Sequence, residues 1–271
     1  MKWGLICNFH VKKACNTGYE IYRFLKEKND EIYPEDKFSK KYKIKGYKME
    51  EINERSDIVI TVGGDGTILR AMEKIDKPVF AINCGGMGFL SEVESKYAKD
   101  GLEKVRNGEY NVEERSKLKI TLDGKRLPDA TNEVTVQTAR IAKIMYLQVF
   151  VGGELIETFG SDGVIVSTST GSTSYSLSVG GPILDPAVDA MVIAPIAPFK
   201  LSARPWVVPL TKEVSIKILH KSKESYIVID GENPQPITSD SNIQITKSEK
   251  KARFVRFGES FYQMFRLKLV R

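Results

Sequence analysis

The residues best suited to chemistry form the short segment Gly63-Gly64-Asp65-Gly66-Thr67. It directly follows an apolar run, residues 57–62, and precedes a stretch of helical character, residues 68–72. Glycines let the backbone turn sharply and bring N–H groups close to a ligand, and a helix N-terminus adds positive partial charge. In an open α/β sheet, ligands bind at the carboxyl ends of strands. The pattern therefore predicts a phosphate-binding loop.

A carboxylate within such a loop repels a phosphate, so Asp65 needs its own explanation. It can cap the helix or complete a turn. It can also act as a general base, or organise a metal ion, at a hydroxyl group that attacks phosphorus. The five residues alone do not choose between these two hypotheses.

A second glycine-rich segment, residues 83–90, follows the next apolar run at residues 78–82. Neighbouring parallel strands end at the same edge of a sheet, so we expect the two glycine loops to form opposite walls of one crevice. The alternative is a tight connection in which the glycines only allow close packing.

Two further segments carry polar groups. They are the pair Asn132-Glu133 and residues 162–175, where an apolar strand leads into a turn rich in hydroxyl groups and glycine. Such a turn can present hydrogen-bond donors to ribose, amide and phosphate groups. Composition alone is equally typical of a flexible Ser/Thr turn.

Other chemistry is poorly supported. The 271 residues contain no G-x-x-x-x-G-K-[ST] motif, no G-x-G-x-x-G after a strand and no G-x-S-x-G elbow. The three cysteines show no C-x-x-C pairing, so neither a disulfide framework nor a zinc site is indicated. No signal peptide or membrane span is predicted, and we expect a cytoplasmic protein. The net charge of +6 suits an anionic ligand, but basic and aromatic residues do not interleave as nucleic-acid binding would require.

The elements that position these residues fall into two regions. In residues 1–108, apolar runs alternate with helical stretches, which predicts an α/β domain with a parallel sheet. In residues 109–257, period-two segments are separated by Asp123-Gly124, Gly152-Gly153 and Asp230-Gly231, which predicts a β-rich, sandwich-like domain of antiparallel strands. Residues 258–271 return to helical periodicity, and we expect this helix to pack on the first domain. The Lys-rich residues 37–48 are interpreted as a solvated loop, with phosphate binding as the alternative.

Taken together, the polar segments resemble the NAD kinase family. Residues 63–67 are similar to its G-G-D-G-T motif, residues 83–90 to its N-x-G-x-L-G-F-L loop, and Asn132-Glu133 to its N-E pair. Residues 162–182 resemble its D-G…T-G-S-T-A-Y-x-L-S-x-G-G-P segment, and residues 201–205 its L-S-x-R-P motif. The matches occur in the family's order from about residue 57 to residue 232.

The resemblance implies an enzyme that phosphorylates the adenosine-ribose 2′-hydroxyl of NAD to give NADP. ATP or polyphosphate would donate the phosphoryl group with Mg²⁺ or another divalent metal, and the protein would be a homodimer or homotetramer with no nucleic-acid or membrane partner. Asp65 would be the general base, Gly66 would line the pocket and Arg70 would approach the phosphates. Asn132 and Glu133 would contact the adenosine portion.

The remaining cofactor contacts that the resemblance implies all lie in the second region. They are Lys143, Asp162, Thr173, Ser174, Tyr175, Ser178 and Glu232. The sequence departs from the family at Ser169, which replaces Pro and is expected to loosen its turn. It also departs at Gly160, Phe199 and Glu232, where relatives have Arg, His and Gln.

Two rival functions stay open at this point. A lipid or sugar kinase can share G-G-D-G-T, although residues 162–182 and Asn132-Glu133 argue against it. A non-catalytic NAD-binding protein is the other rival, and the presence of Asp65 argues against that.

Overall fold

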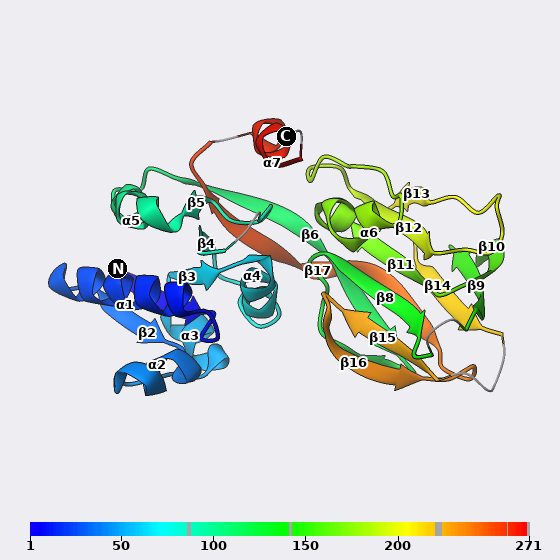
Figure 1. Ribbon diagram of the computed structural model, residues 1–271, viewed down its shortest axis with the longest axis horizontal. Helices are drawn as coiled ribbons and strands as arrows, with labels where there is room; N and C mark the ends of the chain where they lie inside the picture. Colours follow the sequence, from blue (N-terminus) through cyan, green and yellow to red (C-terminus); the bar gives the residue numbers. More distant parts are fainter. Residues whose placement is uncertain (86–87, 141–142, 220–223, 259, 270–271) are drawn as a thin grey trace. The chain divides into compact units, whose positions relative to one another are not determined.

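The computed structural model describes residues 1–85, 88–140, 143–219, 224–258 and 260–269. The chain forms two compact units. Unit 1 comprises Met1–Glu114 and Ala252–Arg271, and unit 2 comprises Arg115–Lys251. Unit 1 is an α/β unit and unit 2 is rich in antiparallel strands, which confirms the fold class predicted from the sequence (Figure 1).

Unit 1 is built on a sheet in the order β17-β4-β3-β1-β2, with β5 beside β4, and its part of β17 (Ile243–Arg256) begins at Ala252. Strands β1 to β5 pair in parallel. The elements are β1 (Lys2–Cys7), α1 (Lys12–Glu27), β2 (Glu31–Pro34), α2 (Asp36–Tyr42), α3 (Met49–Arg55), β3 (Ile58–Gly63), α4 (Asp65–Met72), β4 (Val79–Asn83), β5 (Val93–Glu94), a 3₁₀ turn (Ser95–Tyr97), α5 (Ala98–Arg106) and α7 (Phe261–Leu269).

Apolar residues on both faces of this sheet explain why its strands read as continuous apolar runs. Side chains alternate between faces along a strand, so each face needs its own covering helices. Leu5 and Ile60 belong to the cluster that α1 and α5 complete. Ile6 and Val59 belong to the cluster completed by α3 and α4. The result is a three-layer α/β/α arrangement.

The interpretation of residues 37–48 as a loop is wrong for residues 37–42, which belong to helix α2, whereas residues 43–48 lie outside the helices and named strands. Phe38 is fully buried, and Tyr42 packs against its ring with centroids 5.0 Å apart. These two apolar residues at i and i+4 bury one face of the helix, while the lysines occupy the rest. Because six of these twelve residues are lysines, the segment was interpreted from its charge, and the helical spacing of Phe38 and Tyr42 was not recognised.

Unit 2 contains a six-stranded sheet in the order β13-β12-β11-β8-β15-β16. Strands β10-β9-β14-β17, together with β6 and β7, form its other sheet. The elements are β6 (Asn111–Leu122), β7 (Lys125–Arg126), β8 (Glu133–Thr138), β9 (Met145–Val151), β10 (Glu154–Ser161), β11 (Gly163–Thr168), a 3₁₀ turn (Thr170–Thr173), α6 (Tyr175–Ser178), β12 (Ala190–Ile196), β13 (Trp206–Pro209), β14 (Val214–Ile218), β15 (Ser225–Ile229), β16 (Glu232–Ile237) and β17 (Ile243–Arg256).

One apolar core joins the two sheets of unit 2. Val134 and Val164 of the six-stranded sheet share it with Leu147, Ile216 and other residues of the second sheet. Sheets that pack face to face in this way form a sandwich.

The three predicted two-residue turns are all hairpins. Asp123-Gly124, Gly152-Gly153 and Asp230-Gly231 join β6 to β7, β9 to β10 and β15 to β16. All six residues have positive φ, as the type I′ turn that fits the twist of a hairpin requires.

Strands β6 and β17 pair with each other and are longer than the sequence predicted (Figure 1). Clear period-two alternation in the sequence covers only residues 118–122 and 242–245, whereas β6 comprises 12 residues from Asn111 and β17 comprises 14 residues and ends at Arg256. Both strands therefore pass from one unit into the other. The expected C-terminal helix is present as α7, and its Phe265 ring lies 6.4 Å from that of Phe89 in unit 1. None of the helices in the described part of the chain combines the length and apolar composition needed to cross a membrane.

A buried ion pair fastens the last residues of β17 to the first part of unit 1. The Arg256 guanidinium, 9% exposed, lies 2.9 Å from the Glu92 carboxylate, itself 4% exposed, and 2.8 Å from Glu113. Arg256 also donates a hydrogen bond to the Leu90 carbonyl at 3.2 Å. Glu92 in turn accepts the Phe257 N–H at 2.6 Å. The C-terminal segment is thus tied to the chain that follows the second glycine loop.

We expect Arg256→Met to destabilise the protein by about 3–5 kcal/mol, because it leaves the Glu92 carboxylate buried without its counter-ion. Arg253→Met is the matched control on the same strand. Arg253 pairs with Glu114 in an exposed ion pair at 2.9 Å, so its loss is expected to cost about 1 kcal/mol or less. Denaturant midpoints of both variants and the wild type measure the difference. Equal losses for the two variants would contradict the role given to Glu92.

Candidate functional site

The first glycine loop lies where the strand order of the parallel sheet reverses. β1 is flanked by β2 on one side and β3 on the other, so the connections leaving β1 and β3 run in opposite directions. Open α/β sheets bind ligands in the crevice outside the carboxyl ends of strands at such a point. The loop at residues 63–66 leaves β3 there, beside Asn8, which directly follows β1 and donates its N–H to Val62 O at 2.9 Å. Sequence reasoning overlooked Asn8 because it belongs to no glycine-rich pattern.

Two glycines of this loop face open space. A Cβ atom added at Gly64 or Gly66 would meet nothing within 4 Å, and neither residue has a positive φ. Gly63 is different, because a Cβ there would lie 2.3 Å from the Thr67 hydroxyl. Packing accounts for Gly63, whereas neither packing nor conformation accounts for Gly64 and Gly66. A ligand that approaches the backbone closely would account for both.

The Asp65 carboxylate is held by the second glycine loop. It accepts the Phe89 N–H at 2.8 Å and the Leu90 N–H at 3.3 Å. A Cβ added at Gly88 would lie 2.6 Å from the Asp65 carboxylate oxygen, so only glycine fits beside it. Gly86 and Met87 of the same loop lie outside the described residues. The two glycine loops therefore meet, and one fixes the acidic side chain of the other.

Arg70 lies one turn further along α4 and forms a bidentate ion pair. Its two terminal nitrogens lie 2.5 Å and 2.9 Å from the two oxygens of Glu35, which is 5% exposed. One of them also donates to the Cys7 carbonyl at 3.4 Å. Much of the charge of Arg70 is therefore satisfied within unit 1, and its contact with phosphate stays a prediction. Glu35 escaped notice because it precedes the Lys-rich segment.

In unit 2, the predicted Asn132-Glu133 pair stands at the start of β8 and is almost fully buried. Asn132 is 6% exposed and Glu133 is 7% exposed. Among the described residues, the Asn132 Oδ1 and Glu133 Oε2 atoms have no hydrogen-bond partner. Glu133 Oε1 accepts a long hydrogen bond, 3.4 Å, from the Ser174 hydroxyl. Two buried polar atoms without a partner are expected at a ligand site.

Burial, and to a lesser extent the nearby Asp230 carboxylate, together raise the pKa of Glu133 from its ordinary 4.5 to about 8. The Ser174 hydrogen bond opposes this shift. Burial also raises the pKa of Asp230, against hydrogen bonds from the N–H groups of Thr131, Asn132 and Glu133. Two close carboxylates with little water do not ionise together easily. Near neutral pH, Glu133 is therefore mainly the neutral acid.

The Thr/Ser/Gly segment packs directly on this pair. Thr168 donates its hydroxyl to the Thr131 carbonyl at 2.7 Å, and its backbone N–H to the Asn132 carbonyl at 2.8 Å. A Cβ added at Gly171 would lie 2.1 Å from the Asn132 carbonyl oxygen. The segment is therefore an ordered 3₁₀ turn and short helix, which excludes the alternative of a flexible Ser/Thr turn.

Ser169 was expected to loosen this turn because it replaces a family proline, and that expectation is wrong. Its φ of −59° is close to the value that proline enforces. Its hydroxyl donates to the carbonyl of Val188, with that of Ala190 3.3 Å away. A side-chain hydrogen bond to the chain preceding β12 thus takes over the restraint that the proline ring supplies elsewhere.

The other predicted contacts are less closely grouped. Thr173 is half-buried and lies one residue before Ser174. In the described chain, the side chains of Lys143, Asp162 and Glu232 make no hydrogen bond with the Asn132-Glu133 pair. Positions in unit 2 with at least a third of their surface exposed include Lys143, Tyr175, Ser178 and Glu232.

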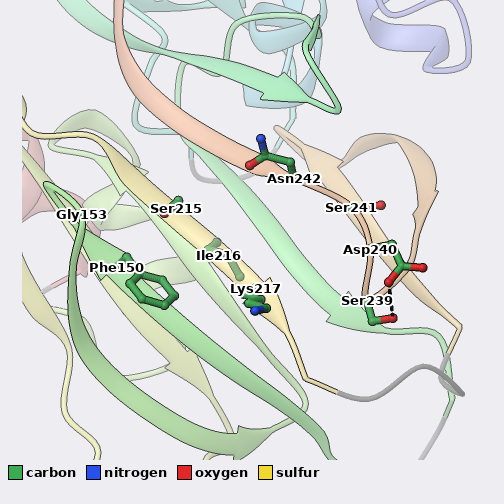
Figure 2. Close-up of a pocket in the computed structure, with 9 residues that line it drawn as sticks. All are labelled: Phe150, Gly153, Ser215, Ile216, Lys217, Ser239, Asp240, Ser241 and Asn242. Carbon is green, nitrogen blue, oxygen red and sulfur yellow. Dashed lines mark hydrogen bonds between the residues drawn. The ribbon is translucent and has the colours of Figure 1, made fainter.

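Two positions that depart from the family lie side by side. The Phe199 N–H donates to the Gly160 carbonyl at 2.8 Å, and the Phe199 ring is 79% exposed. A cavity of about 350 Å³ occurs elsewhere in unit 2 (Figure 2). Phe150, Lys217 and residues 239–242 are among those that line it, and none of the predicted site residues does. We therefore assign the candidate site from the polar segments rather than from this cavity.

Comparisons with known proteins identify the family of this chain. Residues 3–110 match the family model for the ATP-NAD kinase N-terminal domain, and residues 131–257 match that for the ATP-NAD kinase C-terminal domain. NAD kinase of Methanothermobacter thermautotrophicus is 40% identical over 274 residues, covering 100% of this chain and 96% of the relative. NAD kinase of Thermoplasma volcanium is 40% identical over 272 residues, covering 100% and 98%.

Two solved structures are also similar. An NAD kinase from Archaeoglobus fulgidus in complex with ATP has a TM-score of 0.83 and 27% identity, covering 98% of this chain and 97% of that one. Yeast NADH kinase complexed with NADH has a TM-score of 0.92 over 100% of this chain and 87% of that one, and at 23% identity it shows the fold alone. The chain belongs to the NAD kinase family, whose members are phosphotransferases that act on a hydroxyl group.

We expect Gly66→Ala to separate ligand binding from stability. Alanine is about 0.5–1 kcal/mol more favourable than glycine within a helix, and the added methyl group meets no protein atom. The unfolding free energy should therefore stay equal or rise, while apparent affinity for nucleotide falls about tenfold or more, near 1.4 kcal/mol. Gly63→Ala is the contrast variant and should lose stability through its clash with Thr67. Unchanged nucleotide affinity in Gly66→Ala would show that no ligand approaches this backbone.

We expect stability to fall with rising pH through Glu133. An acid whose pKa is higher in the folded state contributes stability that is complete below its unfolded pKa, near 4.5, and lost by about pH 8. Between these two pH values the free energy of unfolding should fall by up to about 1.4 kcal/mol per pH unit. Unfolding free energies of the wild type and Glu133→Gln, measured from pH 5 to pH 9, test this. The wild type should lose stability relative to the variant up to about pH 8, and parallel curves would refute the prediction.

Proposed function

We propose that this protein phosphorylates the 2′-hydroxyl of the adenosine ribose of NAD, using ATP as the donor and forming NADP and ADP. The observation that carries the proposal is the Asp65 carboxylate, fixed by the Phe89 and Leu90 N–H groups beside two glycines that face open space. Family membership supports NAD as the acceptor. The similar Archaeoglobus fulgidus enzyme, solved with ATP, supports the donor.

In the proposed step, Asp65 accepts the proton of the 2′-hydroxyl as that oxygen attacks the γ-phosphorus of ATP. The new O–P bond forms while the bond from the γ-phosphorus to the β–γ bridging oxygen breaks, and ADP leaves with the electron pair. The transition state of phosphoryl transfer is loose, so alignment and charge neutralisation matter more than covalent chemistry. The Asp65 carboxylate is well suited to alignment, because backbone N–H groups bind both of its oxygens and fix the orientation of its side chain.

A divalent cation, Mg²⁺ in our proposal, would neutralise the phosphate charge of the donor. The described residues contain no group of three or more His, Cys, Asp or Glu side chains arranged to hold a metal. Asp65, at the carboxyl end of β3, is the acidic side chain that a nucleotide-borne cation would meet in the first glycine loop. This donor set fits Mg²⁺, which usually keeps several waters and binds through one or two carboxylates and substrate phosphates.

We assign NAD binding in unit 2 to the Asn132-Glu133 pair, whose buried Oδ1 and Oε2 atoms can accept or share hydrogen bonds with the adenosine portion. Ser174 supports this assignment through its contact with Glu133. The resemblance adds the following as further proposed NAD contacts: Lys143, Asp162, Thr173, Tyr175, Ser178 and Glu232.

The proposal is tested by incubating the protein with NAD, ATP and Mg²⁺ and measuring NADP, with polyphosphate and with lipid and sugar acceptors as separate arms. We expect NADP that requires all three components. Tight NAD binding without NADP would favour a binding protein, and phosphorylation of a lipid or sugar in place of NAD would overturn the acceptor.

We expect Asp65→Asn to lower kcat by about 10² to 10⁴-fold, because general-base catalysis contributes about that much and the amide cannot accept the proton. NAD affinity should change far less, since the carboxylate acts as the hydroxyl becomes an attacking oxygen. Asp57→Asn is the matched control. Asp57 stands at the other end of the same strand and likewise accepts a backbone N–H, from Lys2 at 3.0 Å. Near-normal kcat in Asp65→Asn would leave Asp65 a structural residue that only holds the second glycine loop.

A further inference from the structure

The Asp230-Gly231 turn does more than reverse the chain. The Asp230 carboxylate accepts three successive backbone N–H groups, those of Thr131, Asn132 and Glu133, at 2.7, 2.8 and 3.0 Å. The Asp230 N–H returns a hydrogen bond to the Glu133 carbonyl at 2.9 Å. Four hydrogen bonds from one turn residue thus fix the backbone of residues 131–133.

A hairpin turn does not need these bonds. Asp123 occupies the same position in the Asp123-Gly124 turn, with a φ of 52° against 48° for Asp230. Its carboxylate accepts a single backbone N–H, that of Asn242 at 2.6 Å. The two turns share their sequence and conformation, so the three contacts of Asp230 are specific to the segment that it faces.

That segment carries the two buried oxygen atoms of the candidate site, Asn132 Oδ1 and Glu133 Oε2, which have no partner among the described residues. Fixing the backbone beneath them holds both side chains for a ligand. A bound ligand would also remove the cost of leaving them unsatisfied, which is about 1–3 kcal/mol per buried group.

The charge of Asp230 matters as well as its geometry. The charged groups that act on the pair are Lys117 of β6, which favours the ionised form of Asp230, and the two carboxylates themselves. Ser174 adds a hydrogen bond to Glu133 from the start of α6. With three N–H groups and Lys117 supporting it, Asp230 is the member of the pair that ionises first. The proton then stays on Glu133.

We propose that Asp230 is the positioning residue of the Asn132-Glu133 pair, and that its negative charge makes Glu133 bind NAD as the neutral acid, a hydrogen-bond donor. The acceptor on the ligand is then an uncharged nitrogen or oxygen of the nucleoside portion, since a phosphate would be repelled by Asp230. The inference rests on the proposed function in taking NAD as the ligand.

The test measures NAD binding directly, by calorimetry from pH 6 to pH 9.5, alongside NADP formation. Wild-type binding should weaken above about pH 8 as Glu133 ionises. In Asp230→Asn, one amide oxygen can still accept the Asn132 and Glu133 N–H groups, and asparagine tolerates positive φ. We expect NAD affinity at pH 7 to fall about tenfold or more. The pH range over which affinity declines, called here the pH limb, should move to lower pH. kcat at saturating NAD and the KM for ATP should change less than about threefold.

Two further variants make the result specific. Asp123→Asn alters the equivalent turn and should leave NAD binding and its pH limb unchanged. Glu133→Gln is a neutral donor at every pH and should bind NAD at pH 7 while losing the limb. An unmoved limb in Asp230→Asn, or loss of binding at pH 7 in Glu133→Gln, overturns the inference even if the enzyme makes NADP. NAD binding with the expected limb shifts but no NADP would overturn the proposed reaction alone, and no NAD binding would overturn both.

Discussion

Within each unit, backbone N–H groups that bind carboxylates from distant parts of the chain order the segments described here. Asp65 binds the chain at residues 89–90, Glu92 binds Phe257, and Asp230 binds residues 131–133. A loop has few apolar contacts of its own, and its N–H groups must find acceptors when they are buried. A carboxylate can satisfy two or three of them at once and is stronger than a neutral acceptor. Asp65 and Asp230 therefore order a glycine-rich and a polar segment, and Glu92 ties down the end of β17.

Much of the fold could be predicted because its signals are local. The apolar runs at residues 57–62 and 78–82 became β3 and β4, and the Asp-Gly and Gly-Gly dipeptides became two-residue hairpins. A buried parallel strand needs apolar residues on both faces, and a type I′ turn needs positive φ. Both requirements can be recognised from the residue types at a few neighbouring positions. The motif resemblance then grouped segments that local patterns could not group, and family membership confirms it.

The contacts that give the site its properties could not be predicted in this way, since they join residues far apart in the sequence. Asp230 read only as a turn residue, yet it contacts residues about a hundred positions earlier. Arg70 was predicted to approach the phosphates, and its partner Glu35 belongs to none of the motifs. Helix α2 was hidden because its lysines dominate a segment whose two apolar residues make the packing contacts. The ionisation of Glu133 likewise depends on burial and on a neighbour that no spacing rule reveals.

Unit 1 is built from two stretches of chain that are far apart in the sequence, and this affects the order in which it can fold during synthesis. Its first part ends at Glu114, but the residues of β17 that join its sheet begin at Ala252, beyond the whole of unit 2. At about 5–20 residues per second, a ribosome needs on the order of ten seconds to add the intervening chain. During that interval β4 has no partner in β17, and Glu92 is present without Arg256. The nascent chain must therefore spend this time with a sheet edge open and a carboxylate uncompensated, and the last strand to leave the ribosome closes both at once.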